Sequence, residues 1–347
     1  MSKRYLMKGN EAVAEAAVMA GCRHFFGYPI TPQTEINAYM SKRMPQVGGI
    51  YLQAESEIAA INMTLGASAT GARAMTSSSS PGIALKTEGI SYMCGCDLPC
   101  VIVNIQRGGP GLGGIQPSQA DYYLATRAPG HGDLRMLVFA PATVQEMFDT
   151  VFTAFDAAEL YRMPAMLLAD GLLGQMMEPV TPPALPPAPR EKLWALGAGA
   201  PKRKTISSLY LKPEELEEVI RLRFARYSEA ETRLSACEEY LAEDARVLLV
   251  AYGATSRIAR AAVTAAREKG HKAGLFRPKT LWPFPKEQLR AAAAKAGKVL
   301  VVEMSMGQMV SDVRLAVGDT AAVGFFGRTG GVVPLPEELL ERVEALI

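Results

Sequence analysis

Two carboxylates, Glu55 and Glu57, lie at the start of a segment rich in alanine, serine and glycine. The apolar residues that follow recur at helical spacing, which predicts a helix over 57–69. Acidic side chains stabilise the first turn of a helix, and this role explains Glu55. Glu57 has apolar neighbours, so burial would favour its protonated form while the helix dipole would favour the ionised form. Glu57 is therefore the carboxylate whose protonation the fold could control.

A second candidate is the string YPITPQT at residues 28–34. Thr31 followed by Pro32 matches a helix N-cap with proline at the first helical position. A helix N-terminus presents free N–H groups and a positive dipole end to a carboxylate or phosphate. Taken alone, the pattern is explained more simply by a plain capped helix. Two prolines flanking a threonine also stiffen the loop, which would suit a substrate contact.

A third candidate is Arg107, which opens a glycine-rich stretch directly after an apolar run. The glycines of residues 109–114 satisfy G-x-G-x-x-G, so a dinucleotide site must be considered. We reject that site because Pro117 and the lack of helical periodicity leave no helix for the pyrophosphate. A flexible loop that lets Arg107 approach a bound anion is the better interpretation.

Other reactive residue types give weaker patterns. Cys94, Cys96 and Cys100 invite a metal or iron–sulfur interpretation, but their spacing matches no common cluster and no fourth ligand lies nearby. Cysteine at a helix end also behaves as a small apolar residue. The serines of residues 77–80 lack a hydrolase motif, and the three histidines are scattered. We therefore expect no metal site in this chain.

The elements that position these residues alternate between helices and short apolar strands. Such alternation predicts an α/β fold with a parallel sheet covered on both faces. The segment 179–245 reads as a linker, because six prolines fall between residues 179 and 189 and intermingled charges over 214–243 indicate solvent-facing helices. A second, smaller α/β unit follows over 246–347. Before the linker, helices are expected over 11–19, 57–69, 82–93 and 144–160 and from Ile36, and strands over 25–27, 49–52, 72–76, 101–105, 134–139 and 165–168.

Composition excludes several classes of protein. A chain of 347 residues is long enough for two domains with their own cores. Its net charge of +2 is too small to indicate a nucleic-acid partner. No apolar run approaches the roughly 20 residues of a membrane helix, and the N-terminus does not resemble a signal peptide. We expect a cytoplasmic protein without a nucleic-acid or membrane partner.

In combination, the motifs resemble one family, the alpha subunits of the 2-oxoacid:ferredoxin oxidoreductases. The resemblance is carried by YPITP at 28–32, Ser56-Glu57 opening a small-residue helix, residues 77–82, and Arg107. It extends over nearly the whole chain, since FRPKTLWPFP at 276–285 is similar to that family's second domain. The strings at 7–12, 113–119 and 169–175 look most like the branched-chain (2-oxoisovalerate) branch, with 2-oxoglutarate and aryl 2-oxoacids as alternatives.

The resemblance implies a pyrimidine-binding thiamine-diphosphate domain over 1–178, followed by a domain like the transketolase C-terminal domain over 246–347. It implies that Glu57 hydrogen-bonds N1′ of the cofactor's aminopyrimidine and favours the imino tautomer, which removes the thiazolium C2 proton. It assigns the 2-oxoacid contact to Thr31 and Arg107, with Arg107 on the carboxylate. The residues matching the cofactor-binding positions are Glu57, Tyr28, Pro29 and Ile30.

The chain lacks part of the chemistry that such an enzyme needs. Thiamine-diphosphate enzymes hold magnesium and diphosphate with a Gly-Asp-Gly segment and a later asparagine, whereas this chain has no asparagine after Asn104. The resemblance implies that beta, gamma and ferredoxin-like delta subunits supply Mg²⁺, iron–sulfur clusters and coenzyme A contacts. The expected reaction is then oxidative decarboxylation of a 2-oxoacid to an acyl-CoA, with electrons passed to ferredoxin. The rival interpretations are a non-catalytic structural subunit and a non-redox enzyme of the transketolase kind.

Overall fold

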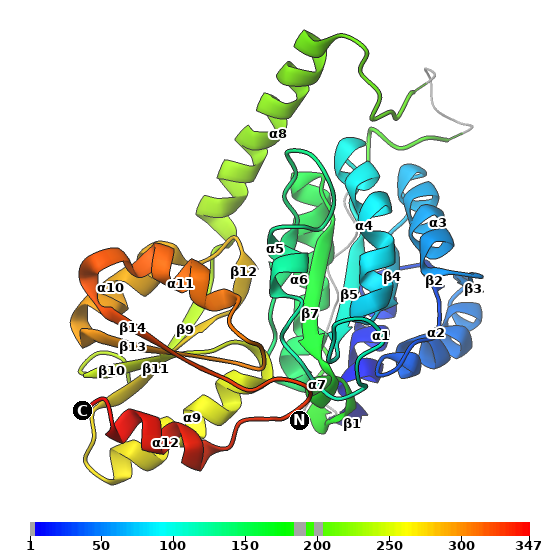
Figure 1. Ribbon diagram of the computed structural model, residues 1–347. Helices are drawn as coiled ribbons and strands as arrows, with labels where there is room; N and C mark the ends of the chain where they lie inside the picture. The colour runs from blue at the N-terminus through cyan, green and yellow to red at the C-terminus, as the bar shows by residue number, and fades with distance from the viewer. Residues whose placement is uncertain (1–3, 184–191, 198–203) are drawn as a thin grey trace.

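The structure is a computed structural model that describes residues 4–183, 192–197 and 204–347. Two α/β units lie side by side, and the long helix α8 (Pro213–Leu234) extends away from both (Figure 1). The first unit is built on a seven-stranded sheet and the second on a five-stranded sheet. Among the prolines of the predicted linker, Pro186, Pro187 and Pro189 lie outside the described residues.

The seven-stranded sheet has the order β12-β6-β7-β5-β4-β2-β3, with every neighbouring pair parallel except β12 with β6. Its central strands β4, β5 and β7 are buried along their whole length, as expected for strands covered on both faces. The strands are β2 (His24–Gly27), β3 (Ile50–Gln53), β4 (Ala74–Ser78), β5 (Val101–Gln106), β6 (Leu137–Phe139), β7 (Ala165–Asp170) and β12 (Thr280–Trp282).

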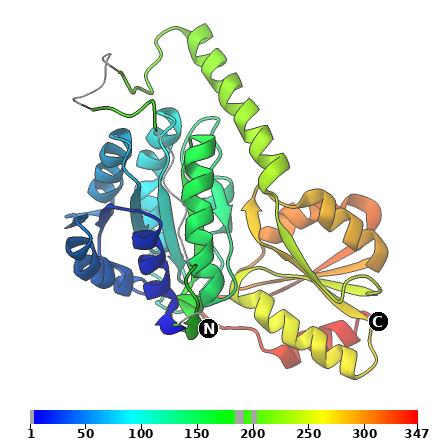
Figure 2. The ribbon, with the colours of Figure 1, turned by 180° about the vertical axis from the view of Figure 1, so that it is seen from behind.

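Helices cover both faces of this sheet (Figures 1 and 2). One layer contains α1 (Gly9–Met19), α2 (Thr34–Gln46) and α6 (Val144–Tyr161), which pack on one another. The other contains α3 (Glu57–Ala69) and α4 (Ser80–Gly95), which also pack together. The remaining elements of the unit are the antiparallel pair β1 (Tyr5–Lys8) and β8 (Met177–Val180), with the short helices α5 (Tyr122–Thr126) and α7 (Gly171–Gln175).

The second sheet has the order β14-β13-β10-β11-β9, in which only β9 is antiparallel to its neighbour. The pair α9 and α12 covers one face and the pair α10 and α11 the other (Figure 1). The elements are β9 (Cys237–Tyr240), β10 (Val247–Val250), α9 (Gly253–Glu268), β11 (Ala273–Pro278), α10 (Lys286–Ala296), β13 (Lys298–Glu303), α11 (Met309–Val317), the 3₁₀ turn η1 (Gly318–Thr320), β14 (Ala322–Gly327) and α12 (Pro336–Glu344).

The predicted α/β class with parallel sheets is confirmed, and two local predictions are wrong. The charged segment 214–243 is not entirely helical, because α8 ends at Leu234 and β9 pairs with β11. Thr31 is not an N-cap, because α2 begins only at Thr34. None of the helices in the described residues is long and apolar enough to cross a membrane.

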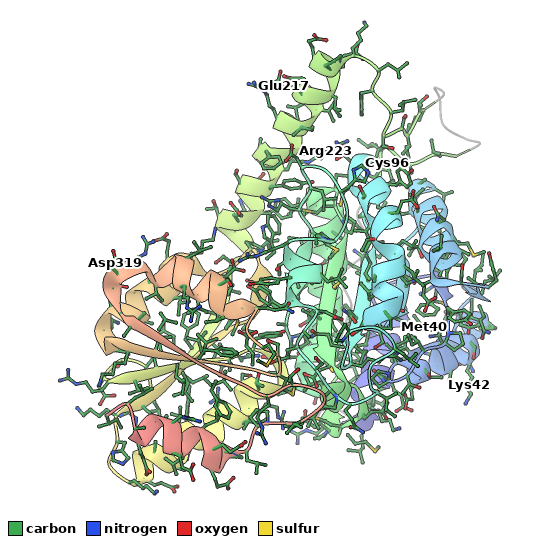
Figure 3. The ribbon with its side chains drawn as sticks, in the orientation of Figure 1. Met40, Lys42, Cys96, Glu217, Arg223 and Asp319 are labelled. Carbon is green, nitrogen blue, oxygen red and sulfur yellow. The ribbon has the colours of Figure 1, made fainter. Side chains whose placement is uncertain are left out.

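The helix α8 is attached to the first unit through its inner half. Arg223 lies beside Cys96 at the end of α4, whereas Glu217 lies further out along the helix (Figure 3). Arg223 Nε is 3.0 Å from Asp97 Oδ1, and Tyr227 packs edge-on against Trp282 of β12. These contacts hold the buried turn of α8 against the end of α4 and against β12.

Arg277 at the end of β11 joins the second unit to α6. Its guanidinium donates two hydrogen bonds to Glu146, at 2.7 and 2.6 Å, and Nε donates to Glu238 at 2.9 Å. Burial alone would raise the pKa of Glu146, but the bonds from Arg277 outweigh it and lower that pKa to about 2. The two units are thus connected by a charged network as well as by strand pairing.

Asp170 at the end of β7 gives the structure a pH-dependent stability. Its buried carboxylate accepts hydrogen bonds from the backbone N–H groups of Leu172, Leu173 and Ala254, yet burial prevails and raises its pKa to about 6. A raised carboxyl pKa contributes stability below the unfolded value of 3.8 that is lost as the pH rises through about 6. We expect the unfolding free energy of the wild type to fall by about 3 kcal/mol relative to Asp170→Asn over that window. Denaturant titrations of both proteins at several pH values measure this difference, and parallel pH curves would contradict it.

Candidate active site

The predicted site residues gather at the carboxyl end of the seven-stranded sheet. The loop 28–33 follows β2, Ser79 and Ser80 follow β4, and Arg107 follows β5, while Glu57 lies a few residues beyond the edge strand β3. Parallel strands bring the segments after them to one edge, which is where α/β sheets bind ligands. The fold therefore assembles residues that are far apart in the sequence.

Glu57 is the first residue of α3 and is only 6% exposed. Ser56 caps the helix, with its Oγ accepting a hydrogen bond from Ala59 N at 3.2 Å. The carboxylate lies against Gly82 of α4, where an added Cβ would stand 2.5 Å from Glu57 Oε1. Within the described residues no hydrogen bond involves either carboxylate oxygen. A buried acid without a partner at a helix N-terminus is suited to binding a hydrogen-bond donor from a ligand.

Two further polar groups near Glu57 are also unpartnered. The hydroxyls of Ser78 and Ser79 are buried without a hydrogen-bond partner among the described residues. A Cβ on Gly82 would approach Ser78 Oγ to 2.1 Å, so this hydroxyl and the Glu57 carboxylate share the space above one glycine. Buried polar groups are nearly always paired. This set of atoms therefore fits a bound group with several polar atoms, such as an aminopyrimidine.

The Arg107 side chain links the loops of the site. Its Nη1 donates to the carbonyl of Thr31 at 3.0 Å and its Nη2 to that of Leu112 at 3.3 Å. Its Nε is buried without a partner in the described part of the chain. The backbone N–H of Arg107 donates to Ser80 Oγ at 3.0 Å, which connects the arginine to the start of α4. The structure thus brings Thr31 and Arg107 together.

Asp121 is a half-buried carboxylate that stabilises this arrangement and that the sequence analysis did not single out. Asp121 accepts hydrogen bonds from Ser80 Oγ at 2.6 Å and from Asn104 Nδ2 at 2.9 Å. Burial raises the pKa of Asp121, and the two hydrogen bonds oppose that rise. The available signal was the pair of polar residues, Asn104 and Gln106, inside the otherwise apolar strand β5. Gln106 Oε1 in turn accepts from Asp121 N at 3.1 Å.

The loop that carries the predicted cofactor contacts is held by amide side chains. Gln33 is fully buried, donates to Tyr28 O at 3.2 Å and accepts from Ser77 Oγ at 2.6 Å. The Pro32 carbonyl accepts from Asn10 Nδ2 at 2.8 Å and from the side chain of Gln175 at 3.0 Å. Within the loop, Tyr28 and Ile30 are half-buried and Pro29 and Thr31 are exposed.

The second unit fastens the Arg107 loop at its far end. Gln119 donates from Nε2 to the carbonyl of Tyr252 at 2.8 Å. Its Oε1 accepts from Thr255 Oγ1 at 2.8 Å and from Met304 N at 3.0 Å. These partners follow β10 and β13, so the second sheet determines where the glycine-rich loop lies.

A cleft of about 700 Å³ adjoins the loop at Thr31. Neither Glu57 nor Arg107 lines it, so it is separate from the space above Gly82. It is lined by Thr31, Pro32, Glu35, Ile115, Gln116, Pro117, Gly171, Leu172, Gln175, Met176, Gly331 and Val333.

The structure also bears on the alternatives considered from the sequence. No helix opens between Arg107 and Asp121, so the glycine run does not form a dinucleotide site. Cys94 is buried, and burial raises the pKa of its thiol to about 12. Among the described residues, no cluster of three or more histidines, cysteines, aspartates and glutamates could hold a metal ion.

The chain is similar to known proteins over nearly its whole length. Residues 15–229 match the family described as "Pyruvate flavodoxin/ferredoxin oxidoreductase, thiamine diP-bdg". Residues 245–339 match "Pyruvate:ferredoxin oxidoreductase core domain II". The chain is 46% identical to the ketoisovalerate oxidoreductase subunit VorB of Methanothermobacter thermautotrophicus, over 97% of this chain and 96% of that protein. It is 36% identical to the 2-oxoglutarate synthase subunit KorA of the same organism, over 99% of each chain.

Two solved structures share the fold. One is a 2-oxoglutarate:ferredoxin oxidoreductase from Magnetococcus marinus, with a TM-score of 0.92 and 28% identity. The match covers 99% of this chain and 65% of that chain. The other is a split-gene transketolase with a TM-score of 0.56 and 16% identity, matched over 97% of this chain and 93% of that chain, a likeness of fold alone. The family match, the near full-length relatives and the site geometry lead to one conclusion: the chain belongs to the 2-oxoacid:ferredoxin oxidoreductases, as their thiamine-diphosphate-binding alpha subunit.

Proposed function

We propose that this alpha subunit serves the oxidative decarboxylation of a branched-chain 2-oxoacid, such as 2-oxoisovalerate, to its acyl-CoA with reduction of ferredoxin. The observation that carries the proposal is the 46% identity over nearly the full chain to a ketoisovalerate oxidoreductase subunit, against 36% to a 2-oxoglutarate synthase subunit.

The loops around the site support a substrate with one carboxylate and an apolar side chain. Arg107 is the only basic residue in the strings 28–34 and 107–119. A dicarboxylate such as 2-oxoglutarate would call for a second cationic group in these loops. Leu112 and Ile115 of the glycine-rich loop are instead apolar and 86% and 57% exposed. They are available to contact an aliphatic group.

Each site residue then has a separate task. Thiamine diphosphate, when bound, supplies the carbanion that attacks the 2-oxo group. Glu57 would hold a proton at N1′ of the aminopyrimidine, and Tyr28, Pro29 and Ile30 would contact the cofactor. Thr31 and Arg107 orient the 2-oxoacid, with the guanidinium on its carboxylate. The unpartnered hydroxyls of Ser78 and Ser79, and a Glu57 carboxylate that accepts no hydrogen bond from the described residues, support the fit of the pyrimidine to this side of the site.

The remainder of the active site belongs to other subunits in this proposal. A beta subunit would bring the diphosphate and Mg²⁺ site and iron–sulfur clusters, and gamma and ferredoxin-like delta subunits would complete the complex with coenzyme A and ferredoxin. The rim of the Glu57 site supports such a partner, because Leu52, Ile58 and Leu85 are each between 42% and 49% exposed. Exposed apolar groups clustered at a site are typical of a protein interface.

The decisive experiment is a reconstituted complex assayed with ferredoxin, coenzyme A and a panel of 2-oxoacids. We expect the highest kcat/KM with branched-chain 2-oxoacids. A preference for 2-oxoglutarate or for aryl 2-oxoacids would overturn the substrate assignment. A colourless homodimer of this chain that is active without partners would indicate an enzyme of the transketolase kind. A complex whose activity survives Glu57→Gln and Arg107→Ala unchanged would indicate a structural subunit.

Replacement of Arg107 should affect substrate binding more than turnover. We expect Arg107→Ala to raise the KM for the 2-oxoacid by about 10- to 100-fold, the value of a charge-assisted hydrogen bond to a carboxylate. Steady-state kinetics of the reconstituted complex give this value, and an unchanged KM for coenzyme A serves as the control. A wild-type KM for the 2-oxoacid would show that its carboxylate binds elsewhere.

A further inference from the structure

Lys86, in the middle of α4, is a fully buried lysine that no proposed step has used so far. It shares the buried face of the helix with Ile83 and Ile90, at the spacing of an apolar stripe. A lysine in such a position is uncommon, because burying an ammonium is costly unless it is paired. A lysine buried at this position therefore needs a specific partner.

The contacts of Lys86 point to Glu57. Its Nζ donates to the backbone carbonyl of Glu57 at 3.3 Å and to Thr76 Oγ1 at 3.0 Å. The ammonium therefore joins the first turn of α3 to β4, with α4 between them. Both acceptors are neutral, so the hydrogen bonds alone leave the charge of Lys86 uncompensated.

The negative charge that compensates Lys86 comes from the side chain of Glu57. The titratable groups that face Lys86 are Glu57 on α3 and Cys100 before β5. Burial raises the pKa of the Cys100 thiol well above its usual range, so it carries no charge near neutral pH. Burial lowers the pKa of Lys86 to about 8, and the Glu57 carboxylate opposes that fall. The attraction between the two charges is mutual.

We propose that Lys86 is a positioning residue for Glu57, one that fixes the first turn of α3 and places a positive charge near the carboxylate. The proposal rests on the proposed contact between Glu57 and N1′. The bond from Lys86 to the Glu57 carbonyl fixes the backbone from which the side chain extends, and so the place where the carboxylate would meet N1′. Lys86 itself touches neither cofactor nor substrate.

The first test uses the full chain without cofactor. The ¹⁵Nζ resonance of Lys86, identified as the one lost in Lys86→Met, should titrate near pH 8 in the wild type. In Glu57→Gln it should titrate at least about one pH unit lower, because the carboxylate that supports the ammonium is gone. An unchanged titration of Lys86 in Glu57→Gln would overturn the proposed coupling.

The second test measures exchange of the C2 proton of thiamine diphosphate in the reconstituted complex, from about pH 6 to about pH 9. In the wild type the exchange rate should fall as the pH rises through about 8, where Lys86 loses its proton. Lys86→Met and Lys86→Gln should exchange about tenfold more slowly below that pH and should lack the step. Gln retains hydrogen-bonding capacity without the charge, so it separates the charge from the contact.

The matched control is Lys42→Met, the same substitution at an exposed lysine on α2 that points into solvent (Figure 3). It should retain the wild-type rate and the step near pH 8. Lys86 variants that retain the step would overturn the assignment of Lys86. A wild-type profile without a step near pH 8 would overturn it even if neither variant folded. A wild-type complex that exchanges no C2 proton would instead overturn the proposed function, and this inference with it.

Discussion

Glu57→Gln is expected to reduce exchange of the C2 proton in bound thiamine diphosphate by at least about a hundredfold, the usual scale of an acid–base role. Gln is nearly isosteric with Glu, so the packing against Gly82 should persist and the complex should assemble. What is lost is the ability to exchange a proton with N1′. Quenched-flow exchange followed by NMR of the released cofactor measures the rate.

Glu55→Gln provides the control, because Glu55 lies two residues earlier and is exposed. It should leave the exchange rate at the wild-type value. If Glu57→Gln retained wild-type exchange, Glu57 would have no part in proton transfer, whatever the activity of the complex.

Gly82→Ala is expected to disable the site without changing any titratable group. The added Cβ would lie 2.5 Å from Glu57 Oε1 and 2.1 Å from Ser78 Oγ, distances at which the neighbouring atoms must move. A displacement of about 1 Å in a catalytic group costs on the order of a hundredfold in rate. We expect a loss of that size in C2 exchange, measured in the assay used for Glu57→Gln.

The control for Gly82→Ala is Gly89→Ala, seven residues further along α4. Its added Cβ would also press on α3, at 2.5 Å from Ile61 Cγ2, but away from Glu57. Overpacking of this kind costs about 1–3 kcal/mol of stability. Gly89→Ala should therefore lower the thermal midpoint and leave exchange intact. Equal losses of exchange in both variants would mean that helix packing, and not the place of the carboxylate, controls the rate.

Local patterns were sufficient to predict much of the fold. The helix over 57–69 has the predicted bounds, because its apolar spacing and its Ser56 cap are both local. The strand expected over 101–105 extends by one residue to Gln106. The helix expected from Ile36 begins at Thr34. The N-cap pattern at Thr31 and Pro32 starts no helix, because the Pro32 carbonyl is bound by Asn10 and Gln175 rather than by the following turn. Those partners are distant in sequence, and no local rule identifies them.

The residues of the candidate site were also only partly identifiable from the sequence. Glu57, Thr31 and Arg107 were singled out because the strings that contain them together resemble one family. Asp121 and Lys86 were missed because their importance comes from burial and from partners on other strands. β9 was missed for a related reason. Its two glutamates fit the charged helical pattern, and only the bond from Arg277 on β11 to Glu238 shows that they belong to an edge strand.

The strand β12 has a practical consequence for work with fragments of this protein. It comes from the second half of the chain but completes the edge of the first sheet, pairing Thr280 with Phe139 and Trp282 with Val138. A truncation that stops at the proline-rich segment would leave β6 with an open edge, a template for aggregation. Chimeras that exchange second halves between relatives would likewise replace one strand of the sheet that carries Glu57. Recombination points are therefore better chosen outside the interval from β6 to β12.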